Sequence, residues 1–108
     1  MPDHLSAIEQ LVLVALLRLS HEAYGVAVQR EIAQRTGREP SLATVYTALS
    51  RLERRELITS RLGDPTAERG VRRKKIFTVR ADGRRALQAS LRDLRAMAQG
   101  VASLERVP

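Results

Sequence analysis

Hydrogen-bond donors gather in one stretch of the chain, between positions 41 and 54. The candidates for binding chemistry there are hydroxyl groups and a guanidinium group, on Thr44, Tyr46, Thr47, Ser50 and Arg51. Such groups donate to phosphate oxygens and to the edges of bases, so this stretch has the chemistry to recognise a polyanion. The competing interpretation is a polar helix face that is simply solvated.

A second group of candidates is basic. Five of the seven positions from 69 to 75 carry a positive charge, namely Arg69, Arg72, Arg73, Lys74 and Lys75. Residues 51–95 have a net charge of +8, whereas the rest of the chain has −1. A localised positive field indicates a nucleic acid partner. Two plainer interpretations compete: a solvated loop, and the codon bias of a GC-rich genome, since 17 of the 19 basic residues are Arg.

Residue patterns for catalysis or metal binding are lacking. The chain has no cysteine, which excludes disulfides and thiolate chemistry. His4 and His21 are the only histidines, and neither has acidic residues at a metal-ligand spacing. The sequence contains neither a Gly-rich phosphate loop nor a nucleophile-elbow motif. We therefore expect no enzyme, no catalytic residue, no metal and no cofactor.

Length and hydropathy favour one small cytoplasmic domain. The chain has 108 residues, of which 44% are apolar. Its longest apolar run, from Leu11 to Leu17, covers seven residues, far short of the ~18 needed to span a membrane. The N-terminal segment carries Asp3 and Glu9 rather than the basic region of a signal peptide. We expect no membrane contact.

Two helices are predicted in the first third of the chain. Ser6 and Glu9 have the spacing of a capping box and predict a central helix from Ser6 to about Leu19. A second helix is expected over Glu22–Thr36, ended by Gly37 at a position that requires a positive φ.

A third helix is predicted to begin at Ser41, which we assign to capping first and to phosphate contact second. Its apolar stripe consists of Leu42, Val45, Leu49 and Leu52. The donors named above lie on the opposite face. Because so few residues separate the second helix from the third, the pair predicts a helix-turn-helix.

Two short strands are expected over Leu57–Leu62 and Lys74–Val79, with the basic loop between them. A helix-turn-helix followed by a basic hairpin is a winged helix. Its third helix, about 20 Å long, fits the major groove of duplex DNA. The basic hairpin reaches the neighbouring backbone or the minor groove, where Arg is favoured.

A last helix is predicted from about Ala81 to Ser103, with a heptad seam formed by Leu87, Leu91, Leu94, Ala98 and Val101. The seam packs either on its own domain or, as we favour, on a second subunit, with Leu11, Leu13 or Leu17 of the first helix as candidate partners. A two-fold dimer presents its third helices to grooves about 34 Å apart. Residues 1–80 then form the DNA-binding unit and residues 81–108 the dimerisation helix.

These residues resemble the PadR family of bacterial transcriptional regulators. Residues 41–53 read Ser-Leu-Ala-Thr-Val-Tyr-Thr-Ala-Leu-Ser-Arg-Leu-Glu, against a family pattern Ser-x-Gly-Thr-Leu-Tyr-x-x-Leu-x-Arg-Leu-Glu. Tyr24-Gly25 and Gly83 also match, whereas Glu56 stands where Gly is common. The resemblance covers residues 5 to about 95. It implies a dimeric repressor, released in some members by a small molecule held at the dimer interface.

The predicted fold is mainly α with a small β-hairpin, a winged helix-turn-helix with an additional C-terminal dimerisation helix. The predicted function is a sequence-specific transcriptional regulator, a homodimeric repressor on a pseudo-palindromic operator in double-stranded DNA, with a small molecule as a candidate effector. The alternative is a winged-helix module that binds an acidic protein. RNA is disfavoured because three aromatic side chains make no stacking platform. The predicted DNA-binding residues are Ser41, Thr44, Tyr46, Thr47, Arg51, Arg69, Arg72, Arg73 and Lys74.

Overall fold

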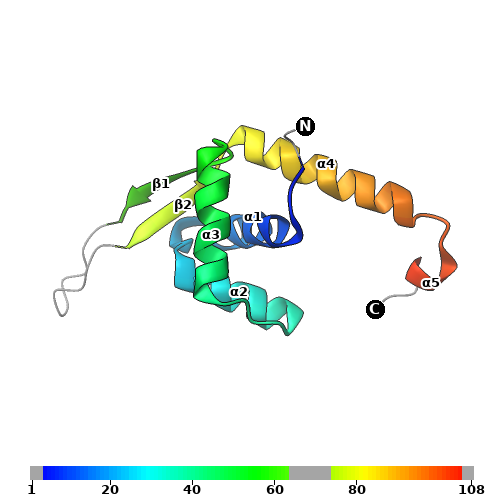
Figure 1. Ribbon diagram of the computed structural model, residues 1–108, viewed down its shortest axis with the longest axis horizontal. Helices are drawn as coiled ribbons and strands as arrows, with labels where there is room; N and C mark the ends of the chain where they lie inside the picture. The colour runs from blue at the N-terminus through cyan, green and yellow to red at the C-terminus, as the bar shows by residue number, and fades with distance from the viewer. Residues whose placement is uncertain (1–3, 64–73, 106–108) are drawn as a thin grey trace.

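The computed structural model describes residues 4–63 and 74–105 (Figure 1). Its elements are α1 (Ala7–Leu19), the 3-10 turn η1 (Ser20–Glu22), α2 (Gly25–Thr36), α3 (Leu42–Arg54), β1 (Ile58–Leu62), β2 (Lys75–Val79), α4 (Ala81–Ala98) and α5 (Ala102–Glu105). Helices α1, α2 and α3 form the centre of the molecule, with the hairpin extending to one side and α4 to the other. The mainly helical winged-helix fold is confirmed.

Helix α1 forms the middle of the core, as its sequence predicts. Its capping box is present: the Glu9 N–H donates to Ser6 Oγ at 3.2 Å, and the Ser6 N–H donates to Glu9 Oε1 at 2.8 Å. Four of its apolar residues are buried, namely Val12, Leu13, Ala15 and Leu16. They pack against both helices of the helix-turn-helix, so α1 is the support on which α2 and α3 are fixed.

Helix α2 begins at Gly25, three residues later than predicted, because the preceding backbone has other partners. Ser20–Glu22 form a 3-10 turn, and Tyr24 is extended. The carbonyl of Ala23 accepts a hydrogen bond from the Phe77 N–H at 2.9 Å, so this segment pairs with β2 instead of joining the helix. The predicted end is confirmed: Gly37 has φ 76°, and its N–H donates to the Ala33 carbonyl.

Helix α3 buries the apolar stripe that the sequence predicts, with one exception. Val45, Leu49 and Leu52 are buried together with Ala48, whereas Leu42 is 38% exposed at the first turn. After the helix, Glu56 takes a positive φ of 61°. This left-handed backbone explains why glycine is usual at the position, and it costs a Glu about 1 kcal/mol.

The hairpin is antiparallel, with Ile58 opposite Val79 and Ser60 opposite Phe77. Each strand begins one residue later than predicted. Ile58 and Phe77 are buried and attach the base of the hairpin to the helical core. The hairpin therefore leaves the core next to the C-terminal end of α3.

Helix α4 ends at Ala98, so the prediction of one helix to Ser103 is wrong. Gly100 adopts φ 85° and interrupts the helix before the short α5. At its other end α4 packs closely on the backbone, since a Cβ at Gly83 would lie 2.3 Å from the Leu57 carbonyl oxygen. Leu87, only 4% exposed, completes this contact with the core. In the part of the chain that the structure describes, no helix combines the length and apolarity of a membrane span.

Candidate nucleic-acid interface

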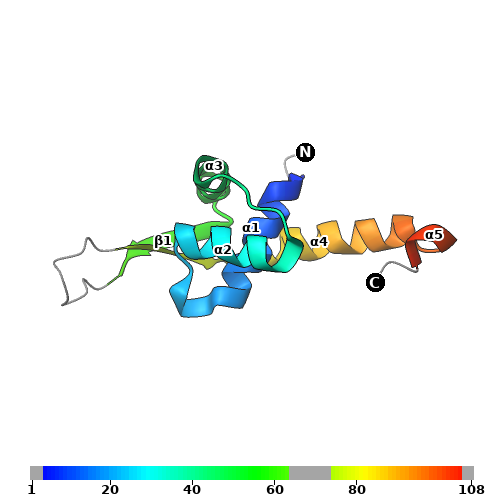
Figure 2. The ribbon, with the colours of Figure 1, turned by 90° about the horizontal axis from the view of Figure 1, so that it is seen from below.

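The polar face of α3 is directed away from the rest of the molecule. Figure 2 shows α3 almost end-on, at the edge of the helical unit. Thr44, Thr47, Ser50 and Arg51 are all exposed, and Tyr46 is 45% exposed. Ser41 performs its first predicted role, because its Oγ accepts the Thr44 N–H at 3.0 Å. The structure thus places the predicted donors of residues 41–51 on one accessible helix.

Tyr46 is held in place by a glycine on the neighbouring helix. A Cβ at Gly25 would lie 2.3 Å from both Cζ and Oη of the Tyr46 ring. The ring therefore packs directly on the backbone at the start of α2, and a side chain at position 25 would force the ring to move. Gly25 was matched to the family pattern without a role, and the structure supplies one: it fixes the side chain of Tyr46.

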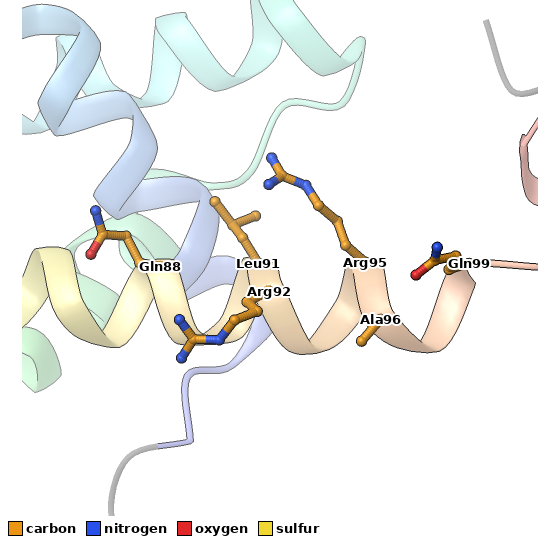
Figure 3. A pocket seen from close by; sticks show the side chains of 6 residues that line it. All are labelled: Gln88, Leu91, Arg92, Arg95, Ala96 and Gln99. Carbon is orange, nitrogen blue, oxygen red and sulfur yellow. The ribbon is translucent and has the colours of Figure 1, made fainter.

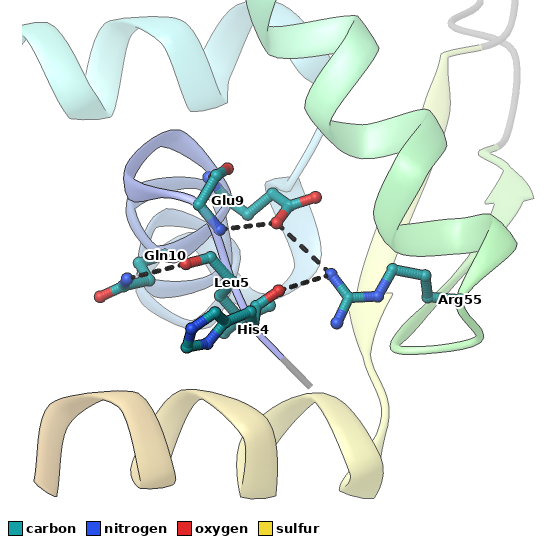
Figure 4. Close-up of polar contacts among 6 residues, drawn as sticks. His4, Leu5, Glu9, Gln10 and Arg55 are labelled. Carbon is teal, nitrogen blue, oxygen red and sulfur yellow. Dashed lines mark hydrogen bonds and ion pairs between the residues drawn. The ribbon is translucent and has the colours of Figure 1, made fainter. Parts of the chain in front are cut away.

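A partly buried ion pair joins the end of α3 to the start of α1 (Figure 4). Arg55 Nη1 lies 3.4 Å from Glu9 Oε1 and also donates to the His4 carbonyl at 3.1 Å. Glu9 is only 5% exposed, and a buried carboxylate is stabilised by such charged partners. The sequence predicts only the local capping role of Glu9, because a contact across 46 residues leaves no periodic signal.

A second carboxylate joins α3 to the hairpin. Ser60 Oγ of β1 donates to Glu53 Oε2 at 2.6 Å, and Lys75 Nζ of β2 lies 3.8 Å from Glu53 Oε1. One side chain of α3 thereby contacts both strands. Sequence analysis assigned no role to Glu53 beyond its place in the family pattern.

The described part of the basic loop also contacts the helix-turn-helix. Lys74 is exposed, and its Nζ lies 3.9 Å from the centroid of the Tyr24 ring, within cation–π range. The other three predicted basic contacts, Arg69, Arg72 and Arg73, lie outside the described residues. Among the residues that are described, no three His, Asp or Glu side chains group as a metal site would require.

The predicted heptad seam is divided between two environments. Leu87 belongs to the core, and Leu91 is half-buried against it. Ala98 is half-buried, whereas Leu94 is 63% exposed and Val101, beyond the helix end, is 42% exposed. On α1, the candidate partner Leu11 is exposed, Leu17 is half-buried against the core, and Leu13 is fully buried. Leu13 is therefore unable to meet a second subunit.

An open groove of about 850 Å³ runs along the C-terminal half of α4, lined by Gln88, Leu91, Arg92, Arg95, Ala96 and Gln99. Figure 3 shows Leu91 and Arg95 on one side of the helix and Arg92 and Ala96 on the other. The groove lies beside the exposed apolar residues of α4.

Solved structures with the same fold are transcription regulators. A PadR family regulator from Clostridium difficile R20291 superposes with a TM-score of 0.74 at 20% identity, over 92% of this chain and 98% of that chain. A PadR family regulator from Eggerthella lenta gives 0.68 at 26% identity, over 92% and 84%. BpsR of Bordetella bronchiseptica, whose DNA binding is regulated by 6-hydroxynicotinic acid, gives 0.63 at 24%, over 93% and 70%.

No curated protein matches the sequence. The model of the transcriptional regulator PadR-like family matches residues 12–89, which include the helix-turn-helix, the hairpin and the first half of α4. The match spans well over half of the chain and agrees with the winged-helix geometry. The chain therefore belongs to the PadR-like family of transcriptional regulators.

Proposed function

We propose that the protein is a homodimeric transcriptional repressor that binds a pseudo-palindromic operator through α3 and the hairpin. The observation that carries the proposal is the division of α3 into a buried apolar stripe and an accessible face of hydroxyl and guanidinium donors. Thirteen residues give a helix about 20 Å long, and a helix of that size fits the major groove.

The two ends of α3 have different roles in this proposal. Thr44, Tyr46 and Thr47 in its first half contact phosphates and base edges, and Arg51 reaches a phosphate or a base further along. Lys74 and the three arginines of the loop, Arg69, Arg72 and Arg73, contact the adjacent backbone. These hairpin contacts supply salt-dependent affinity for any sequence.

The dimer surface is assigned to the apolar residues that the chain leaves exposed toward its C-terminal end. They are Leu94, Met97, Val101 and Leu104, at 63%, 78%, 42% and 52% exposure. Large apolar side chains that stay exposed close together in the sequence favour an interaction site. Leu11 and Val14 of α1 are exposed as well and are the proposed counterpart. Residues 81–108 are thus the dimerisation segment, and residues 1–80 the DNA-binding unit.

An effector would act at this dimer surface. The groove along α4 lies beside it and is lined by two guanidinium groups and two amides. Regulation of DNA binding by 6-hydroxynicotinic acid in BpsR, a structural neighbour of this chain, supports an effector that binds there and releases the repressor. An occupant of the groove shifts α4 and so changes the separation of the two α3 helices.

The test measures binding to the DNA that flanks the protein's own gene, by fluorescence anisotropy against a random duplex. Thr47→Val removes a donor from the face of α3, and Thr59→Val, at an exposed position of β1, is the matched control. We expect Thr47→Val to weaken specific binding about tenfold, the effect of losing one base-edge contact, while binding to the random duplex stays unchanged.

Two results would contradict the proposal. One is wild-type protein that binds both duplexes equally, which favours the module for an acidic protein partner. The other is a Thr47→Val variant that behaves like Thr59→Val. That result would show that the donor face of α3 does not contact the operator.

A further inference from the structure

A hollow of about 380 Å³ lies where α2, α3 and the hairpin meet. Its lining consists of Tyr24, Val26, Arg30, Tyr46, Lys74 and Lys75. Three of these six residues are cationic, and none is acidic. The hollow adjoins the donor face of α3, because Tyr46 belongs to both.

The cations around the hollow are only partly neutralised by the protein. Lys75 is paired with Glu53 at 3.8 Å. Lys74 contacts the face of the Tyr24 ring, and Arg30 is exposed with no carboxylate partner among the described residues. Among the described residues, two positive charges therefore remain without an acidic partner at this site, and an anion between them would relieve their repulsion.

The walls of the hollow are held by contacts within the protein. The Tyr46 ring packs on Gly25, and Tyr24 lies in the extended segment that β2 holds through Ala23. The phenol of Tyr46 is a hydrogen-bond donor, Lys74 supplies a compact charge, and a planar guanidinium such as that of Arg30 has the geometry for two parallel hydrogen bonds to phosphate oxygens. This combination suits a singly charged phosphodiester.

We propose that this hollow binds one phosphate of the DNA backbone, at the point where a strand passes between α3 and the hairpin. The proposal rests on the proposed function, and it adds Arg30 of α2 to the interface. The sequence gives no sign of this role for Arg30, because nothing in the chain's periodicity brings it toward residues 74 and 75.

The experiment combines protein variants with neutral phosphates. A footprinted operator duplex is synthesised with a single methylphosphonate at successive positions, each of which removes one backbone charge. For wild-type protein we expect several positions to weaken binding. For Arg30→Gln we expect affinity for the unmodified operator to fall about tenfold, with a salt slope smaller by about one. At one of the positions where a methylphosphonate weakens binding of wild-type protein, the same methylphosphonate should not weaken binding of Arg30→Gln any further, because the charge contact is already lost.

Two further variants distinguish loss of the phosphate site from a general loss of positive charge and from a loss of folding stability. Arg84→Gln removes the same charge from an exposed position of α4, and its affinity should stay within twofold of wild type. Tyr46→Phe keeps the ring on Gly25 but removes the hydroxyl, and should weaken binding two- to fivefold with unchanged thermal unfolding.

Each outcome decides between the claims. If wild-type protein shows no preference for the operator, the proposed function fails. If it prefers the operator but Arg30→Gln behaves like Arg84→Gln and keeps the wild-type methylphosphonate profile, the phosphate site is refuted while the function stands. If inorganic phosphate competes with DNA for wild-type protein and the methylphosphonate profile of Arg30→Gln is unaltered, the hollow takes a free anion and the proposal is again overturned.

Discussion

Replacing Glu53 by alanine should have two opposing effects on the affinity for DNA. One comes from the charge near the proposed DNA-binding surface, and the other from the position of the hairpin. Glu53 contacts Ser60 of β1 at 2.6 Å and Lys75 of β2 at 3.8 Å. The substitution removes a negative charge from the vicinity of DNA, which favours binding. It also releases the hairpin from α3, which disfavours binding because the hairpin must then be ordered by the DNA.

The magnitudes show which effect is larger. A hydrogen bond to a charged group contributes about 1.5–3 kcal/mol, and we take about 1.5 because the Glu53 side chain is 36% exposed. The exposed pair with Lys75 adds at most about 0.5 kcal/mol. A charge about 10 Å from a phosphate interacts by about 0.4 kcal/mol in water, and by less in salt. The free energy lost when the hairpin is no longer held by Glu53 is therefore larger than the gain from removing the negative charge. We expect Glu53→Ala to weaken binding about tenfold.

The assay is operator binding by anisotropy at several salt concentrations, with urea unfolding to confirm that each variant folds. Ser60→Ala is the matched control for charge, because it removes the hydrogen bond and leaves the net charge at +7. We expect it to weaken binding about tenfold, equivalent to the ~1.5 kcal/mol assigned to the hydrogen bond, with an unchanged salt slope. The double variant should bind no more weakly than Glu53→Ala alone, since the two residues form one interaction.

The reasoning is refuted if Glu53→Ala binds the operator as tightly as wild-type protein or more tightly, while Ser60→Ala has no effect. In that case the surface charge, and not the orientation of the hairpin, governs affinity.

Two other predictions concern α4. Gly83→Ala places a Cβ 2.3 Å from the Leu57 carbonyl oxygen, which also accepts the Arg80 N–H at 2.9 Å and has little freedom to move. We expect the free energy of unfolding to fall by about 1–3 kcal/mol in urea titrations, against about 1 kcal/mol for Gly37→Ala, where space is open and only φ is strained. Equal losses would show that α4 packs less closely than described. Leu94→Asp places a charge in the exposed apolar surface and should give monomers in sedimentation experiments; a dimer that persists would locate the interface elsewhere.

Local signals in the sequence predicted most of the fold. The capping box at Ser6, the N-cap at Ser41 and the stop at Gly37 are set by neighbouring residues, so each is visible without tertiary information. The accessible face of α3 follows from its period in the same way. The resemblance in residues 41–53 agreed with these signals and named the family.

One source of error is competition between distant parts of the chain for the same backbone groups. Ala23 accepts a hydrogen bond from Phe77, 54 positions away, and this pairing delays the start of α2. The end of α4 was predicted wrongly because the heptad pattern continues past Gly100, whereas the helical backbone conformation stops before it. The positioning roles of Glu9 and Glu53 depend on contacts with Arg55 and Ser60 that form only in the folded chain.

The contact between Tyr46 and Gly25 has an evolutionary consequence. The two positions are 21 residues apart, and the ring occupies the volume that any side chain at position 25 would need. Alanine at position 25 therefore requires the ring to move: a homologue with alanine there should carry a smaller residue at position 46 or a Tyr46 ring turned away from α2. Such a lineage would have exchanged the proposed aromatic contact to DNA for freedom at the start of α2, and its operators should differ accordingly.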